Sequence, residues 1–359
     1  MSIRRRALLA SLSALSASVM LSGTAGAAQR ISAPELATGS PEAVGAPIGA
    51  LSLGVYRPSF PNDLSGLGQV RHAGPGNVAI VHWFALWGGW KSAFSRTDLE
   101  RVPADSTPMI SWEPWSGNGP EPAWSLRRAI LSGVNDAYIA EWARGLAEFG
   151  RPVLLRFAHE MHNQPMYPWA VGNNGNTAEE YVSAWHHVRA IFARHGATNV
   201  KWVWNPNTMG DAPLDAYLPL YKALYPGDDA VDWAGLDIYN TGPSLDWGAP
   251  YWRSFDQVLR TPYEAITAVS SKPVVLPEVG CTEQGGSKGS WIAEAVSADS
   301  AQRFPKLRAM VWFDVNKEQA WQLASSEASL QAWRGALNAP LSMDDGPATS
   351  LDARHSAGL

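Results

Sequence analysis

Eight short runs of β-forming residues, separated by helical patterns, predict an α/β chain that folds as a single-domain (β/α)8 TIM barrel. The runs are residues 51–56, 77–84, 107–115, 152–160, 199–207, 231–240, 273–280 and 307–315. Strands that alternate with helices are typical of a parallel sheet with crossover connections. A doubly wound open sheet is the alternative, but the first strand–helix turn lacks a glycine-rich phosphate loop. The closed barrel is therefore the simpler arrangement.

Helix-start and helix-stop signals support the segments between the runs. Asn135 is expected to cap a helix that continues to Phe149. Residues 177–180 read Thr-Ala-Glu-Glu, a capping-box pattern that opens a helix toward His195. Two further segments have a helical pattern: residues 254–270 and 291–303.

The composition excludes several classes of protein. Of the 359 residues, 46% are hydrophobic and 17% are charged, which is incompatible with disorder of the whole chain. The net charge of −5 argues against a nucleic-acid partner, which normally requires a basic surface. The chain also holds 18 tryptophans, which indicate an aromatic core or indole faces that bind flat ligands such as sugars.

The N-terminal residues 1–28 have the pattern of a secretory signal peptide. Three arginines precede an uncharged stretch at residues 7–21, which is too short for a membrane span, and Ala-Gly-Ala at 25–27 supplies a cleavage site. The pattern fits both a Sec signal and a twin-arginine signal. We therefore expect a secreted or periplasmic protein with no membrane span in the mature chain.

The rest of the chain divides into three segments. Residues 29–50 are expected to form a linker or arm, residues 51–339 the catalytic barrel, and residues 340–359 a flexible tail. Cys281 is the single cysteine, so no intrachain disulfide can form, and we interpret it as a packing residue. We expect a monomer.

Two glutamates are the candidate catalytic pair. In such barrels the active site lies at the C-terminal ends of the strands, and Glu160 and Glu278 each follow an apolar run there. One carboxylic acid and one carboxylate are what glycoside hydrolysis requires. Arg156 has the same parity as Glu160 on an extended strand and could balance charge. Glu113 and Asp237 are rival carboxylates with an expected role in substrate binding or support.

A metal site was the alternative for residues 159–162, which read His-Glu-Met-His. The zinc-binding motif of metalloproteases places two histidines four residues apart on a helix, whereas His159 and His162 are three apart at a strand end. The sequence therefore predicts no metal and no cofactor.

Several ordered phrases resemble glycoside hydrolase family 26. They include Trp-Glu-Pro at 112–114, Arg-Phe-Ala-His-Glu-Met at 156–161, Tyr-Pro-Trp at 167–169, residues 199–207, 225–229 and 231–240, Glu-Val-Gly at 278–280 and Val-Trp-Phe-Asp at 311–314. The phrases lie between residues 51 and 333, most of the expected mature chain. The resemblance implies the barrel fold and a retaining hydrolase.

The same resemblance implies roles for individual residues. Glu160 would be the acid/base and Glu278 the nucleophile, with Tyr239 bonded to the nucleophile, Trp312 as a sugar platform and Trp204 lining the site. The full set expected to bind substrate is Arg156, His159, Trp112, Glu113, Trp204, Asp237, Tyr239 and Trp312.

The sequence departs from the family pattern at one place. Met166 stands where the family has a tryptophan, and the loop around it is one residue longer.

The predicted function is cleavage of internal β-glycosidic bonds in a polysaccharide or oligosaccharide, with β-mannan as the leading substrate. A β-1,3-xylanase or β-glucanase of the same family is an alternative. A degenerate barrel that binds an exopolysaccharide without cleaving it is another, although such a barrel would be expected to lose one glutamate.

Overall fold

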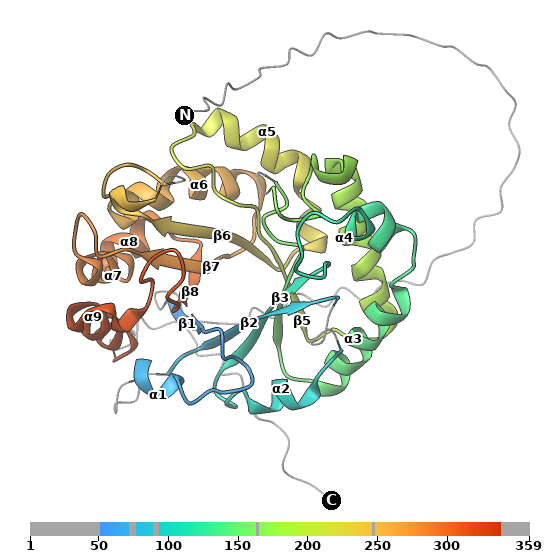
Figure 1. Cartoon of the computed structure of the whole chain (residues 1–359), viewed down its shortest axis with the longest axis horizontal. Coiled ribbons are helices and arrows are strands. Elements are labelled where there is room, and N and C mark those ends of the chain that lie inside the picture. Colours follow the sequence, from blue (N-terminus) through green and yellow to red (C-terminus); the bar gives the residue numbers. More distant parts are fainter. Residues whose placement is uncertain (1–50, 72–76, 89–92, 163–164, 246–247, 339–359) are drawn as a thin grey trace, which may run out of the picture. The chain divides into compact units, whose positions relative to one another are not determined.

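Eight parallel strands close into a barrel in the order of the sequence, as predicted. The computed structural model describes residues 51–71, 77–88, 93–162, 165–245 and 248–338. The strands are β1 (Ser52–Tyr56), β2 (Ile80–Leu86), β3 (Thr107–Glu113), β4 (Val153–Phe157), β5 (Val200–Trp204), β6 (Trp233–Asn240), β7 (Val274–Cys281) and β8 (Leu307–Phe313). Figure 1 shows the strands inside a ring of helices.

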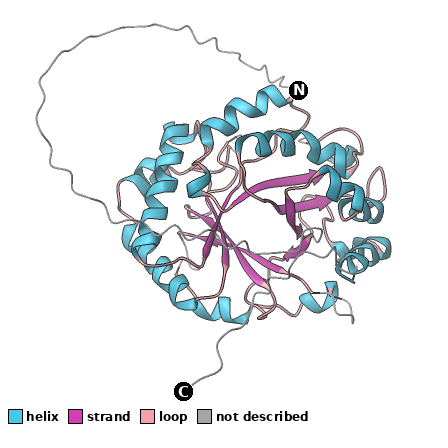
Figure 2. Ribbon diagram, turned by 180° about the vertical axis from the view of Figure 1, so that it is seen from behind, coloured by secondary structure: helices cyan, strands magenta, loops and turns pink. Residues whose placement is uncertain are grey.

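The helices cover the outer surface of the strands, as the view from behind shows (Figure 2). They are α1 (Leu67–Val70), α2 (Arg96–Arg101), α3 (Asp136–Phe149), α4 (Ala178–Arg194), α5 (Leu214–Leu224), α6 (Phe255–Val269), α7 (Lys288–Ala295), α8 (Ala298–Arg303) and α9 (Glu327–Asn338). Short helical turns are η1 (Pro122–Trp124), η2 (Leu126–Leu131), η3 (Asn173–Gly175), η4 (Asp228–Ala230), η5 (Gly242–Ser244) and η6 (Leu323–Ser325).

Capping signals in the sequence explain most of the helix ends, but two of the predictions about helices need correction. The predicted capping box at Thr177 is present, with both reciprocal hydrogen bonds to Glu180. The predicted helix at residues 291–303 is wrong, because it is two helices: the Ser297 side chain caps a new start at α8. Asn135 precedes α3 as predicted, but its side chain makes no capping bond and donates instead to the Ala129 carbonyl.

Side chains alternate between the inside of the barrel and the layer under the helices. A small apolar cluster fills the interior: Ile80, Met109, Leu154, Val203, Trp233, Val275, Ala309 and Val311. The larger cluster, which lies between the strands and helices, holds most of the tryptophans and also Cys281. Polar residues occupy the interior positions near the C-terminal ends of the strands. The barrel interior is therefore apolar toward the N-terminal end and polar toward the C-terminal end.

The predicted signal peptide (1–28), arm (29–50) and tail (340–359) lie outside the described residues. In the described part of the chain, no helix combines the length and the apolar character that crossing a membrane requires.

Candidate active site

Polar side chains from five strands meet at the C-terminal end of the barrel. The predicted residues found there are Glu113 at the end of β3, Arg156 on β4, His159 and Glu160 just after β4, Asp237 and Tyr239 on β6, and Glu278 on β7. Two residues that sequence reasoning did not single out, Ser111 on β3 and Asn205 after β5, join the same network.

Arg156 is the centre of this network. Its side chain is completely buried. Nη1 donates to Glu278 Oε1 over 2.7 Å and to Ser111 Oγ over 2.9 Å. Nε donates to Asn205 Oδ1 over 3.0 Å, and Nη2 donates to Asp237 Oδ2. A guanidinium with all its nitrogens bound to protein is fixed in place, so it acts on substrate through the carboxylates it holds.

Glu278 receives a donor on each of its two oxygens. Besides the bond from Arg156 to Oε1, the Tyr239 hydroxyl donates to Oε2 over 2.7 Å. Gly280 makes this possible, because a Cβ at position 280 would lie 2.6 Å from Cδ1 of the Tyr239 ring. Both oxygens of the Glu278 carboxyl group are thus held in place by hydrogen bonds from protein donors.

Glu160 is placed by a turn rather than by an extended strand. The strand β4 ends at Phe157, and Ala158 and Glu160 have φ values of 43° and 48°, so the predicted parity with Arg156 does not apply. The Glu160 amide donates to the Asn205 carbonyl over 2.7 Å. Non-glycine residues rarely adopt positive φ, and such turns are concentrated at functional sites.

The electrostatic surroundings of Glu160 favour its protonated form. Burial of the carboxyl raises the pKa of Glu160 to about 8, the negative charge of Glu278 adds to this effect, and the positive charge of Arg156 opposes it. The residue as a whole keeps part of its surface accessible. At neutral pH the site therefore offers one carboxylic acid at Glu160 and one carboxylate at Glu278.

A second cluster surrounds Glu113. Its Oε2 accepts a hydrogen bond from the Trp115 indole over 3.3 Å, and its Oε1 lies 3.8 Å from Nε2 of His159. The Tyr167 hydroxyl is 3.3 Å from the same nitrogen, and the Tyr167 ring stacks on Trp169 with centroids 4.3 Å apart. Burial raises the pKa of Glu113 to about 8 and keeps the pKa of His159 well below its usual range.

A buried histidine continues the network below Arg156. Nε2 of His82 lies 2.7 Å from Ser111 Oγ, which already accepts from Arg156. Ser111 therefore links the His82 ring to the Arg156 guanidinium. Burial and the charge of Arg156 lower the pKa of His82, so its ring is held in the neutral form.

The structure contradicts three predicted sugar contacts. Trp112, Trp204 and Trp312 have no exposed surface, and all three lie in the layer between strands and helices. Their partners are helical: Trp112 packs against Trp142 on α3, Trp204 against Tyr221 on α5, and Trp312 against Trp291 on α7 and Trp333 on α9. Each is one position out of phase with the interior residues of its strand.

Three further predicted residues lie in the site but are buried. Arg156, His159 and Asp237 are 0%, 0% and 1% exposed, so almost none of their surface is open to a substrate. Among the predicted residues, Glu113, Glu278, Glu160 and Tyr239 retain more accessible surface. Within the described ranges, no three His, Cys, Asp or Glu side chains are grouped as metal ligands.

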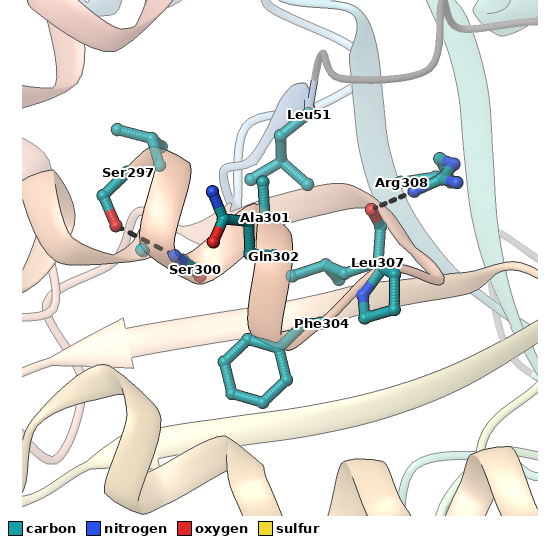
Figure 3. A pocket seen from close by; sticks show the side chains of 11 residues that line it. Leu51, Ser297, Ser300, Ala301, Gln302, Phe304, Leu307 and Arg308 are labelled. Atoms are coloured by element: carbon teal, nitrogen blue, oxygen red, sulfur yellow. Dashed lines mark hydrogen bonds between the residues drawn. The ribbon is translucent and has the colours of Figure 1, made fainter.

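A cavity of about 290 Å³ lies at the N-terminal end of the barrel, opposite to this network. Its lining includes Leu51 before β1, Ser300, Ala301 and Gln302 on α8, and Leu307 and Arg308 at the start of β8 (Figure 3). Its lining contains no carboxyl group, so it does not compete with Glu160 and Glu278 as a hydrolytic site.

A carboxylic acid and a carboxylate at the C-terminal end of a (β/α)8 barrel define the site of a glycosidase. The model of glycosyl hydrolase family 26 matches residues 127–275. The chain is 37% identical over 265 residues to Endoglucanase H of Acetivibrio thermocellus, which covers 72% of this chain. It is 32% identical over 115 residues to Beta-1,3-xylanase TXYA of a Vibrio species, which covers 31% of this chain.

A solved structure has the same fold. The family 26 β-mannanase from Bacteroides ovatus superposes with a TM-score of 0.57 at 17% identity and covers 81% of this chain and 89% of its own. The chain spans only 27% of the length of Endoglucanase H and 22% of that of the xylanase. The chain belongs to glycosyl hydrolase family 26.

Proposed function

We propose that this glycoside hydrolase cleaves internal bonds of a β-linked polysaccharide by double displacement, with retention of configuration. One observation carries the proposal. Glu278 accepts hydrogen bonds from Arg156 and Tyr239, whereas the pKa of Glu160 is raised to about 8. Two carboxyl groups held in opposite charge states are suited to the roles of nucleophile and acid.

In the first step, the Glu278 carboxylate attacks the anomeric carbon as the bond to the leaving oxygen breaks. Glu160 gives its proton to that oxygen, so the departing sugar leaves as a neutral alcohol. The product is an ester between the sugar and Glu278, and Glu160 is left ionised. The loss of negative charge from Glu278 removes the repulsion that had opposed ionisation of Glu160.

In the second step, Glu160 takes a proton from water, and the resulting nucleophile attacks the anomeric carbon from the side of the departed sugar. The ester bond breaks, which restores the Glu278 carboxylate to its two donors, Arg156 and Tyr239. Both substitutions invert the carbon, so the overall reaction retains configuration.

We place β-glucan ahead of β-mannan as the substrate. The relative called Endoglucanase H is 37% identical over most of this chain, whereas the Bacteroides β-mannanase is 17% identical. Met166, where the family resemblance leads us to expect a tryptophan, is 52% exposed and offers no flat face to a mannan chain. A protonated Glu113 can both donate to and accept from a sugar hydroxyl.

The experiment that tests the proposal is release of reducing sugar from a panel of mannans, xylans and β-glucans by the purified chain. We expect release from a β-glucan, with a mixture of oligosaccharides that indicates internal cleavage. Binding to a polysaccharide without release from any of them would contradict the proposal and favour a non-cleaving barrel. We also propose export through residues 1–28, which fusion of this segment to a reporter enzyme would test.

A further inference from the structure

A completely buried lysine holds the loop that follows β8. Lys288 is the first residue of α7, and its side chain has no exposed surface. Its Nζ donates to the Ala320 carbonyl over 2.7 Å, to the Gln322 carbonyl over 3.1 Å and to Ser325 Oγ over 2.6 Å. Glu283 supplies a counter-charge 3.7 Å away and accepts a hydrogen bond from Ser325. All three protons of the ammonium group are thus directed at one loop.

The two carbonyl acceptors stand on either side of Trp321. Lys288 therefore fixes the backbone at Trp321 from both directions, and the Trp321 carbonyl accepts a further bond from the Trp312 indole over 2.7 Å. The Trp321 side chain is 1% exposed, and its ring packs against Tyr239 with centroids 5.1 Å apart. The position of the indole thus depends on a loop that a distant lysine secures.

Tyr239, Trp321 and Gly280 pack against one another. A Cβ at position 280 would meet both rings, at 2.6 Å from Tyr239 and 3.0 Å from Trp321, so the two rings and the β7 backbone are in close contact. This packing directs the Tyr239 hydroxyl to Glu278 Oε2, 2.7 Å away. Close-packed groups transmit a displacement because no free space absorbs it.

We propose that Lys288 is a positioning residue. It acts through Trp321 and Tyr239 to place the carboxylate of Glu278. Its ammonium group donates to the loop backbone on either side of Trp321, so its influence passes through that backbone. The inference rests on the proposed function, in which Glu278 is the nucleophile. A lysine with only a structural role would stabilise the fold and leave the reactivity of Glu278 unchanged.

The test compares Lys288→Met with a matched control, Lys306→Met. Lys306 also donates to a backbone carbonyl, that of Ser270 over 3.1 Å, but at the opposite end of the barrel. The measurement is the rate of inactivation by a 2-deoxy-2-fluoro glycoside, which reports attack by the nucleophile, together with KM on a cleaved β-glycan. We expect inactivation to slow about tenfold in Lys288→Met with KM within twofold of the parent, and no change in Lys306→Met.

Two outcomes separate this proposal from the proposed function. If the parent protein is not inactivated at all, the proposed function fails. If the parent is inactivated and Lys288→Met reacts at the same rate, or if KM alone changes, the role of Lys288 is refuted while the proposed function stands. Should Lys288→Met not fold, Ser325→Ala removes one of the three acceptors and is expected to slow inactivation two- to threefold; an unchanged rate there also refutes the role.

A double-mutant cycle shows whether the effect passes through Tyr239. Tyr239→Phe removes the hydroxyl that donates to Glu278. If Lys288 acts by placing that hydroxyl, adding Lys288→Met to Tyr239→Phe should slow inactivation no further. Effects that multiply in the double variant would show that Lys288 acts by another route, and would overturn the proposal.

Discussion

Arg156 on β4 donates through Nη1 to Oε1 of Glu278 on β7, over 2.7 Å, so one hydrogen bond joins two strands that are not neighbours. The same guanidinium pairs with Asp237 and also attracts Glu160. A single cation therefore interacts with three carboxyl groups. Glu278 and Asp237 accept its hydrogen bonds, whereas Glu160 interacts with it through charge alone, and this unequal sharing distinguishes the two glutamates.

The two glutamates should respond differently to truncation. Glu278→Ala should abolish turnover even with a good leaving group, because no glycosyl ester can form. Glu160→Ala should lose about 10²–10⁴-fold on a polysaccharide but react readily with an aryl glycoside whose leaving group needs no proton. Added azide should then accelerate the Glu160→Ala variant. Steady-state rates with both substrates check this, and the reverse behaviour would mean that the roles are exchanged.

The pH dependence of activity should have its basic limb near pH 8. Glu160 must be protonated for the first step, and the pKa of Glu160 is raised to about 8, so kcat/KM should fall as the pH rises through this value. Glu113 has a similar value, so Glu113→Gln serves as the control. The basic limb should persist in that variant. Its disappearance would assign the limb to Glu113 instead.

Glu160 should also make the fold less stable at high pH. Its pKa is about 8 in the folded chain and 4.5 in the unfolded one, so the folded state binds more protons between these values and stability falls as the pH rises. Glu160→Gln should therefore raise Tm above pH 8 by roughly 3 °C or more, with the difference vanishing near pH 4. Thermal unfolding across pH, with exposed Glu264→Gln as control, measures this. A pH-independent difference would contradict the raised pKa.

The strand–helix order of the chain was enough to predict the barrel, and the glutamates after two apolar runs pointed to the correct end of it. The sequence pattern alone did not predict the turn after β4. The positive φ at Ala158 and Glu160 depends on tertiary contacts, including the bond from the Glu160 amide to the Asn205 carbonyl. Arg156 and Glu160 belong to the same site because of this turn, and not because they share parity on an extended strand.

Strand alternation accounts for the burial of the tryptophans. Trp112 is adjacent to Ser111 and Glu113, which both face the interior, so strict alternation places its indole under the helices. The same alternation applied to Arg156 would have drawn attention to Ser111 as an interior polar residue near the strand end. Asn205 lies beyond the end of β5, where alternation gives no guidance.

Met166 offers a test of substrate choice. It is 52% exposed in the loop after β4, where an indole could stack on a sugar face and add on the order of 0.5–1.5 kcal/mol. Met166→Trp should therefore shift preference toward linear mannan by up to about tenfold. The comparison is kcat/KM on linear mannan and on a mixed-linkage glucan for both proteins. A parent value on linear mannan above about 10⁵ M⁻¹s⁻¹ would show that this loop does not limit mannan use.

The most direct test of the account is to identify the residue that carries the covalent intermediate. A 2-deoxy-2-fluoro glycoside slows the second step, so the sugar ester accumulates and mass spectrometry of the digested protein can locate it. The donors on both oxygens of Glu278 and the proton held by Glu160 predict that the sugar is attached to Glu278. Attachment to Glu160, or release of a product of inverted configuration with no labelled peptide, would contradict the assignment of the two glutamates.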